Sequence, residues 1–232
     1  MNKNSAVPDR GGVLYLVGTP IGNLEDVTFR AVRLLKEVGL IAAEDTRKTR
    51  ILLGRYDINS RLTSFNARNG RKKVPELMDF LKSGRDLAIV SEAGTPAVSD
   101  PGGLLVRAAL EAGVTVRTVP GASSVTAALS VSGLPAGAFY FLGFLPKKAG
   151  KRKKILEKAA ALESTIVIFE PARSLVQRLQ ECLLLCGDRQ VVVCREMTKL
   201  YEEIRYGRVS EMVDHYTHQP PRGEVTIVIS PG

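Results

Sequence analysis

The chain has 232 residues, 44% hydrophobic and 25% charged, which is ordinary composition for a soluble globular protein. That length accommodates one large domain or two domains of about 100–120 residues each. The formal charge of +9 favours an anionic partner, such as nucleic acid, an anionic membrane surface or an acidic small molecule. No apolar run approaches the roughly 18 residues of a membrane span, and the N-terminus lacks a signal-peptide core, so we expect a cytoplasmic protein.

The cysteines and histidines are too few and too scattered to indicate a metal site. Cys182 and Cys186 lie four residues apart in an apolar helical pattern, which is typical of buried thiols. We therefore expect no metal and no disulfide framework, and the chain suits a reducing compartment.

Apolar runs alternate with amphipathic stretches in the first half of the chain. Strands are predicted over residues 13–17, 40–43, 87–90 and 114–119, and helices over 25–37, 103–112 and two segments ending near 53 and 82. Apolar runs without alternating polarity are typical of strands buried on both faces. Their alternation with helices predicts an α/β domain with a parallel sheet, in which ligands bind at the carboxyl ends of the strands.

The second half of the chain has a different pattern. Strands are predicted over 139–142, 165–169, 190–194, 203–206 and 224–229, with helices over 151–162 and 174–186. Because little sequence separates the last strands, this half is expected to contain a mixed sheet. The sequence thus predicts two α/β domains, residues 12–120 and 121–232.

Three loops rich in small residues follow predicted strands. Residues 18–23 read Gly-Thr-Pro-Ile-Gly-Asn, a spacing that fits neither the dinucleotide-binding nor the P-loop motif. Residues 92–103 contain three glycines and two prolines, and residues 120–124 read Pro-Gly-Ala-Ser-Ser. Small residues let a ligand approach backbone amides, although tight structural turns would have similar composition.

Together these segments resemble the tetrapyrrole methylase family. The resemblance covers about residues 12–230 and includes Leu16–Leu24, Ala43–Arg47, Ala93–Pro96, Ser99–Gly102, Gly143–Pro146, Arg195–Lys199 and Gly223–Glu224. It implies a two-domain α/β fold with S-adenosylmethionine in the cleft between the domains. Within the family, the chain is similar to members that methylate the 2′-hydroxyl of a cytidine in small-subunit (16S) ribosomal RNA, and a homodimer is expected.

The sequence departs from the family pattern at four places. Glu92 stands where the family usually has Asp, and 66–69 lacks two usual histidines. Ala122 and Ser123 replace a Pro-Ser pair, and 169–174 differs from the usual Tyr-Glu-Ser-x-His-Arg run. The changes at 66–69 and 171–174 bear on the substrate more than on cofactor binding.

The resemblance also implies which residues surround the cofactor and which carry the reaction. The cofactor contacts would be Pro20, Ala93, Gly94, Thr95, Val98, Ser123, Ser124, Phe169, Arg195 and Glu224. A ribose hydroxyl is a weak nucleophile, so a base or a cation beside it should help. The first candidates are Glu196 and Lys199, and the second are Glu44 and Asp45; strand-end ion pairs are the alternative for both.

RNA contacts are expected from three basic segments, since lysine and arginine neutralise phosphates without reading sequence. These residues are Arg47, Lys48, Arg50, Arg68, Arg71, Lys147, Lys148, Lys151, Arg152, Lys153 and Lys154. A solvated helix face would explain the last run equally well. Two other functions remain open, a methyltransferase acting on a tetrapyrrole carbon and a non-catalytic RNA-binding protein on a methylase scaffold.

Overall fold

A computed structural model describes residues 11–232, and the chain divides into two compact units, residues 1–123 and 124–232. The first ten residues, on which the expectation of no signal peptide depends, lie outside the described part. In the described part, no helix combines the length and the apolar character needed to cross a membrane.

Unit 1 is built on a five-stranded sheet in the order β3-β2-β4-β1-β5, and all its strand pairs are parallel. The strands are β1 (Val13–Val17), β2 (Leu40–Ala43), β3 (Leu62–Ser64), β4 (Leu87–Val90) and β5 (Thr115–Val119). The helices are η1 (Leu24–Asp26), α1 (Phe29–Glu37), α2 (Thr46–Arg55), α3 (Gly70–Lys82) and α4 (Gly103–Glu111). The predicted parallel sheet is confirmed.

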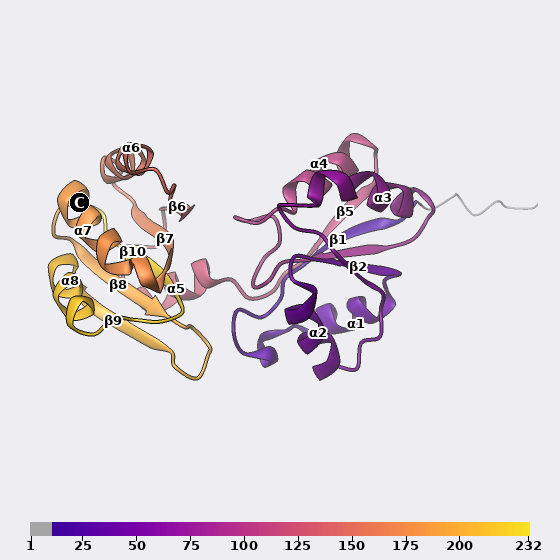
Figure 1. The fold of residues 1–232 in the computed structure, drawn as a ribbon, viewed down its shortest axis with the longest axis horizontal. Coiled ribbons are helices and arrows are strands. Elements are labelled where there is room, and N and C mark those ends of the chain that lie inside the picture. The colour runs from indigo at the N-terminus through magenta and orange to yellow at the C-terminus, as the bar shows by residue number, and fades with distance from the viewer. Residues whose placement is uncertain (1–10) are drawn as a thin grey trace, which may run out of the picture. The chain divides into compact units, whose positions relative to one another are not determined.

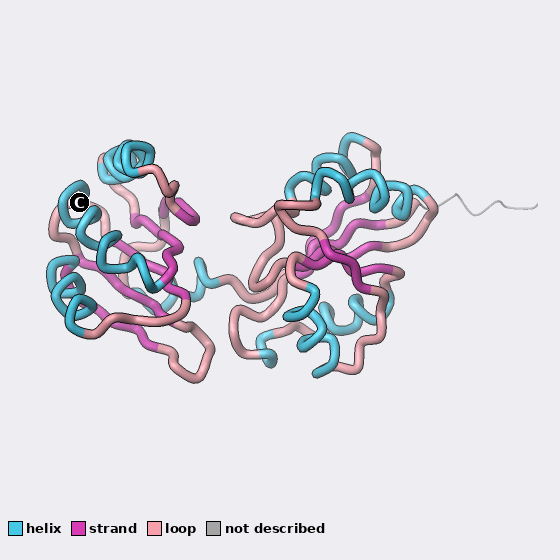
Figure 2. The backbone as a smooth tube through the Cα atoms, viewed as in Figure 1, coloured by secondary structure: helices cyan, strands magenta, loops and turns pink. Residues whose placement is uncertain are grey.

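Helices cover both faces of this sheet (Figures 1 and 2). On one face, α1 and α2 contribute Leu35 and Leu53 to a core that includes Ile41 of β2. On the other face, α3 and α4 contribute Leu77 and Leu105 to a second core. Strands β2 and β4 are buried along their whole length, which explains why they read as unbroken apolar runs.

Unit 2 contains a second five-stranded sheet in the order β6-β7-β10-β8-β9. The strands are β6 (Phe139–Phe144), β7 (Thr165–Pro171), β8 (Gln190–Arg195), β9 (Glu203–Arg208) and β10 (Glu224–Ile229). The helices are α5 (Ser124–Ser132), α6 (Ala149–Ala160), η2 (Ala172–Ser174), α7 (Leu175–Cys186) and α8 (Val209–His218). Only β6 and β7 run parallel among these neighbours, so the predicted mixed sheet is confirmed.

The main core of unit 2 lies between one face of its sheet and α6, α7 and α8, while α5 contacts β10 (Figure 1). Leu156, Leu179 and Met212 bring one buried side chain from each of these three helices into the core. Cys182 and Cys186 are buried on α7 and are not disulfide-bonded, as the apolar helical pattern predicts.

Three elements differ most from the sequence prediction. The first helix begins at Phe29 rather than at residue 25, because the Thr28 side chain caps it by accepting from the Ala31 amide at 3.1 Å. The apolar pattern does not predict β3, a three-residue edge strand in a basic segment, or α8, whose polar face interrupts that pattern.

Gly18→Ala tests how tightly the strand ends of unit 1 pack. A Cβ on Gly18 would lie 2.8 Å from the Cα of Gly121, so we expect a loss of about 1–3 kcal/mol in unfolding free energy. Gly54→Ala is the matched control, because nothing lies within 4 Å of its added Cβ and alanine favours the helix by up to about 1 kcal/mol. Urea unfolding followed by circular dichroism should shift in opposite directions, and an unchanged midpoint for Gly18→Ala would contradict the packing account.

Candidate functional site

The loops after β4, β1 and β5 meet at one edge of unit 1, because these three strands are neighbours in a parallel sheet. Thr19 and Gly94 form a two-way backbone bridge, with N···O distances of 2.9 and 3.1 Å. Gly18 donates its amide to Val119 at 2.9 Å and lies against Gly121. The two backbone segments approach so closely at Gly18 and Gly121 that an added Cβ on either residue would overlap the other.

The loop after β4 has an unusual backbone. Gly94 has φ +78°, and Ala97 and Ser99 have φ values of 67° and 62°, which side-chain-bearing residues rarely adopt. The Ser91 hydroxyl holds the start of the loop by donating to the carbonyls of Ala93 and Gly94, at 3.2 Å each. Strained conformations of this kind concentrate at ligand sites, where the surrounding structure maintains them.

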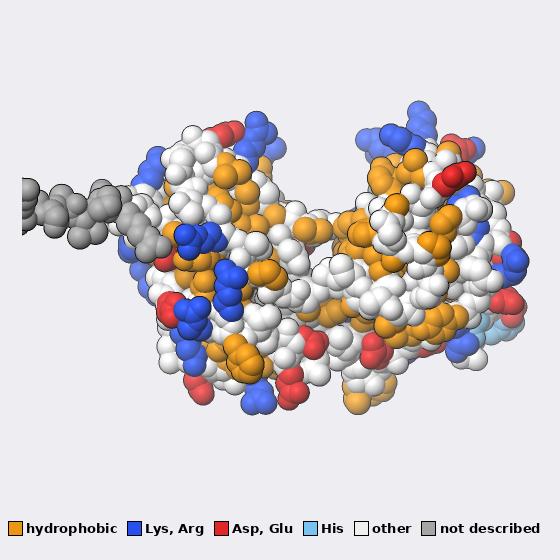
Figure 3. All heavy atoms as spheres, turned by 180° about the vertical axis from the view of Figure 1, so that it is seen from behind, with side chains coloured by type: hydrophobic (Ala, Val, Ile, Leu, Met, Phe, Trp, Pro, Cys, Tyr) orange, Lys and Arg blue, Asp and Glu red, His pale blue; other side chains and the backbone are white. Residues whose placement is uncertain are grey.

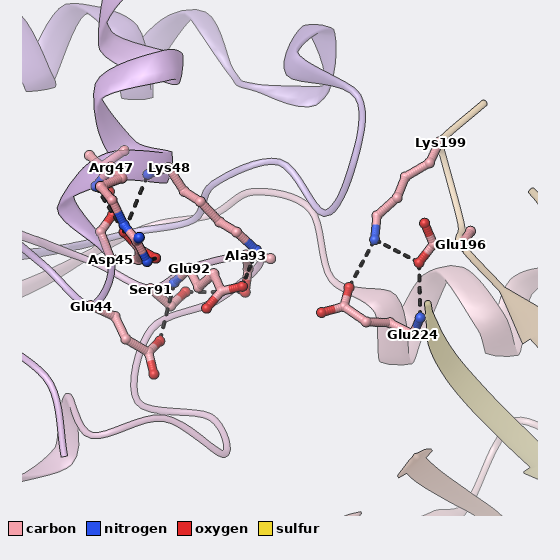
Figure 4. Close-up of polar contacts among 11 residues, drawn as sticks. Glu44, Asp45, Arg47, Lys48, Ser91, Glu92, Ala93, Glu196, Lys199 and Glu224 are labelled. Carbon is pink, nitrogen blue, oxygen red and sulfur yellow. Dashed lines mark hydrogen bonds and ion pairs between the residues drawn. The ribbon is translucent and has the colours of Figure 1, made fainter. Parts of the chain in front are cut away.

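Carboxylates gather beside this loop (Figure 4). The Glu92 amide donates to the Glu44 carboxylate at 3.2 Å, and the Glu92 carboxylate pairs with the Lys48 ammonium. Burial, together with the negative charges of Glu44 and Glu92, raises the pKa of Asp100 to about 6. Asp100 lies in one of the motifs that carry the family resemblance, but it is not among the predicted site residues, because the sequence does not show that its side chain is half-buried.

Asp45 caps helix α2. Its carboxylate accepts from the backbone amides of Arg47 at 2.8 Å and Lys48 at 3.4 Å. Hydrogen bonds from Arg47 hold the pKa of Asp45 below its ordinary value. The capping contacts give Asp45 a structural role that accounts for its position after β2, whereas Glu44 faces Glu92.

In unit 2, three charged side chains form one cluster at the ends of β8 and β10 (Figure 4). The Lys199 ammonium lies 2.9 Å from both Glu196 Oε1 and Glu224 Oε2, and Glu196 Oε1 also accepts the Glu224 amide at 2.9 Å. Glu196 and Thr198 have φ values of 49° and 63°. Gly223 has φ +94°, which favours glycine, and a Cβ there would also overlap the Glu196 carboxylate.

The environment keeps both members of the first candidate pair, Glu196 and Lys199, charged. Burial alone would raise the pKa of Glu196, but bonds from Lys199 and the Glu224 amide leave it below its ordinary value. Burial alone would lower the pKa of Lys199, but the two carboxylates leave it raised. Glu196 is therefore a weak base that orients Lys199, and Lys199 is a positioned cation.

The unit 2 residues expected around the cofactor lie on neighbouring strands. Phe169 of β7 and Arg195 of β8 flank β10, which begins at Glu224. The Phe169 ring packs against Phe141 and Phe144, with centroid distances of 4.8 and 5.5 Å. Arg195 is held by Glu203, whose Oε2 accepts from its Nε at 2.8 Å.

The unit 1 residues of the same set lie on the meeting loops or just after them. These are Pro20, Ala93, Gly94, Thr95, Val98 and Ser123, and Ser124 begins α5 of unit 2. Pro20 and Gly94 are buried, whereas Ala93 and Val98 are exposed.

Ten of the eleven expected RNA contacts are exposed. Arg47, Lys48, Arg50, Arg68 and Arg71 lie on unit 1, and Lys147, Lys148, Lys151, Lys153 and Lys154 on unit 2. Arg152 does not fit the prediction, because only 4% of it is exposed and its guanidinium pairs with Glu181. We reassign it to the interior of unit 2. Among residues 11–232, no group of three or more His, Cys, Asp and Glu could hold a metal ion.

Comparison with protein families matches residues 13–213 to the model described as Tetrapyrrole (Corrin/Porphyrin) Methylases. The chain is 47% identical over 220 residues to the ribosomal RNA small subunit methyltransferase I of Thermotoga maritima, covering 94% of this chain and 98% of that protein. It is 45% identical over 221 residues to the protein of the same name from Halalkalibacterium halodurans, covering 95% and 76%.

Solved structures of two other proteins share the fold. Uroporphyrin-III C-methyltransferase from Thermus thermophilus, complexed with S-adenosyl homocysteine, superimposes with a TM-score of 0.66 at 22% identity, covering 95% of this chain and 97% of that one. A diphthine synthase superimposes with a TM-score of 0.74 at 14% identity, covering 94% and 89%. The two-domain α/β fold implied by the sequence is thereby confirmed.

Asp100→Asn should stabilise the protein relative to the original chain, increasingly as pH rises from about 4 to about 6. The pKa of Asp100 is about 6 in the folded state against 3.8 as its ordinary value, so the folded state binds the proton more tightly and loses stability as pH rises through that window. Urea unfolding at several pH values measures this difference between the two proteins.

Asp188→Asn is the control, because bonds from Ser210 hold the pKa of Asp188 below its ordinary value. Its contribution is lost only as pH falls below the window, so its difference from the original chain should stay nearly constant above about pH 4.5. A constant difference for Asp100→Asn over the same window would contradict the assigned burial of Asp100.

Proposed function

Because the chain belongs to the tetrapyrrole methylase family, we propose that it transfers a methyl group from S-adenosylmethionine to small-subunit ribosomal RNA. The observation that carries the proposal is identity of 44–47% to several proteins named ribosomal RNA small subunit methyltransferase I, over 94–95% of the chain. The finer proposal is that the methylated atom is the ribose 2′-oxygen of a cytidine.

The strand-end loops of unit 1 fit the chemistry of this donor. At this edge Thr19 bridges Gly94 and Gly18 lies against Gly121, and loops built from such small residues let a ligand approach the main chain. The nearby carboxylates of Glu44, Glu92 and Asp100 suit a ligand with a sulfonium and an ammonium group. Phe169, Arg195 and Glu224 of unit 2 are the remaining proposed contacts of the cofactor.

S-adenosylmethionine, when bound, supplies a methyl group already activated by its sulfonium. The chain's own contribution is to position the attacking oxygen and to stabilise the charge that develops on it. Lys199 suits that task, because Glu196 and Glu224 hold its ammonium in place and keep it protonated. Glu44 is the second candidate for contact with the acceptor.

A lysine stripe on α6 supports an RNA partner. Lys151, Lys154 and Lys158 are spaced three and four residues apart, so they share one exposed face and span about 10 Å. None of the three forms an ion pair with another described residue, whereas Lys153 on a different face pairs with Glu157 at 3.7 Å. Figure 3 shows Lys and Arg side chains gathered over the part of unit 2 where α6 lies.

The proposal includes two further expectations. The chain works as a homodimer, as the family resemblance implies, and it acts in the cytoplasm, where an enzyme of this substrate meets ribosomal subunits. Sedimentation of the purified chain measures the first, and fractionation of cells that express it measures the second.

The proposed reaction predicts that radiolabelled S-adenosylmethionine labels isolated small ribosomal subunits or their RNA, with the label on a cytidine ribose. Lys199→Met should lower kcat by roughly 10²–10³-fold, the usual effect of removing one group that stabilises an oxyanion. Lys36→Met, which removes an exposed lysine of α1, is the matched control and should leave kcat unchanged.

Uroporphyrinogen is the competing acceptor in this assay. Label only in the tetrapyrrole would defeat the RNA proposal, and donor binding without transfer to either acceptor would identify a non-catalytic RNA-binding protein. An unchanged kcat for Lys199→Met would remove that lysine from the reaction.

The lysine stripe predicts a specific salt dependence. Replacing Lys151, Lys154 and Lys158 with Gln should weaken RNA binding and reduce the slope of log K against log salt by about 2–3, because each lost phosphate contact reduces it by roughly 0.7–0.9. Replacing the exposed Lys36, Lys82 and Arg107 with Gln removes the same charge from unit 1. Fluorescence anisotropy should show a larger reduction of the slope for the stripe variant than for the control variant. Equal slopes would mean that the stripe acts only through its contribution to the net charge.

A further inference from the structure

Four charged side chains form a connected network inside unit 2. Arg178 bonds Glu170 through Nε at 2.9 Å and Nη2 at 3.4 Å, and it also pairs with Glu181. Arg152 holds Glu181 from the other side, through Nε at 2.7 Å and Nη2 at 2.5 Å. Arg152, Arg178 and Glu170 are each no more than 5% exposed, so the network runs through the interior from α6 to β7.

At one end of the network, Arg152 holds the backbone segment that leads into α6, the helix that carries the lysine stripe. The Nη1 of Arg152 donates to the carbonyl oxygens of Pro146 at 3.0 Å and Lys147 at 2.8 Å. These carbonyls belong to the segment that leads into α6, and Lys147 and Lys148 are exposed on it. The guanidinium thus fixes the backbone of a basic segment from beneath.

The other end of the network lies in β7. Glu170 follows Phe169, whose ring packs between β6 residues rather than toward the network. Because successive side chains of a strand point to opposite faces, the network and the Phe169 ring share one backbone but face different sides of the sheet. The same short segment of β7 therefore anchors the network and presents the proposed cofactor contact.

Stability alone is a poor explanation for such a network. Desolvating several charges costs free energy that their attraction only partly restores, and packed apolar side chains often stabilise a core as well or better. A guanidinium offers instead a planar set of donors with fixed directions, which here holds one carboxylate and two carbonyls at once. That arrangement constrains where the 146–148 backbone lies.

We propose that Arg152 is a positioning residue for RNA binding, and that its network with Glu181, Arg178 and Glu170 holds the Pro146–Lys148 segment in a fixed place relative to β7. The inference rests on the proposed function, because it assigns RNA as the ligand of that segment. In this proposal Arg152 does not make the phosphate contact that the sequence predicts, but acts on RNA binding indirectly through Lys147 and Lys148.

Arg152→Lys tests this role, because lysine keeps the charge but cannot hold Glu181 and two carbonyls together. We expect KM for RNA to rise about tenfold, the factor that accompanies loss of a charge-assisted hydrogen bond. KM for S-adenosylmethionine and kcat should stay within about twofold, since Phe169 is still held by its ring contacts. Amide hydrogen exchange should become faster at residues 147–151.

Arg189→Lys is the matched control. Arg189 also holds α6 from beneath, but at its far end, where Nη2 donates to the Ala160 carbonyl at 3.0 Å. This variant should lower the melting temperature without raising KM for RNA or exchange at 147–151. If it raises KM for RNA as much as Arg152→Lys does, the role is general stability and the inference is overturned.

Two readouts separate this inference from the proposed function. If the original chain labels no RNA, the proposed function fails, and hydrogen exchange still decides whether Arg152 holds the segment. If Arg152→Lys changes neither exchange nor KM for RNA, positioning by Arg152 is wrong. Should Arg152→Lys not fold, Glu181→Gln weakens the same link with an isosteric side chain, and the same two outcomes apply.

Discussion

The close approach of backbones at the strand ends of unit 1 is the constraint on which the rest of the site depends. Gly18 lies against Gly121, and the bridge between Thr19 and Gly94 joins a second pair of loops. Parallel strands bring these loops to one edge, and small residues allow them to meet without side chains between them. The result is an edge built from main chain and small residues, which a polar methyl donor can approach closely.

In unit 2, buried and half-buried charges are held by partners with fixed geometry, because an unpartnered buried charge is costly. Lys199 lies between Glu196 and Glu224, and Gly223 leaves the room that Glu196 occupies. Glu196 and Lys199 thus form the strand-end ion pair that was the alternative to a catalytic role. The same ion pair also keeps the Lys199 ammonium in a fixed position. A structural contact and a catalytic contribution are compatible at this place.

The sequence predicts the strands and helices well where the apolar pattern is long, and it fails where side-chain direction decides. The run from Lys147 to Lys154 reads as uniformly basic, but the helix turns Arg152 to the same side as Leu156 and Ala159. Asp45 looks like an acid at a strand end, and only the structure shows its capping bonds to Arg47 and Lys48. The half-buried state of Asp100 depends on a folded loop that no local pattern describes.

A crystal structure of the chain grown with S-adenosylhomocysteine tests the central claim most directly. The account predicts that the ligand lies on the loops around Thr19, Gly94 and Ser123, with its polar groups bonded to backbone amides and carbonyls. Density for the ligand at another place, or loops closed over by packed side chains, would contradict it.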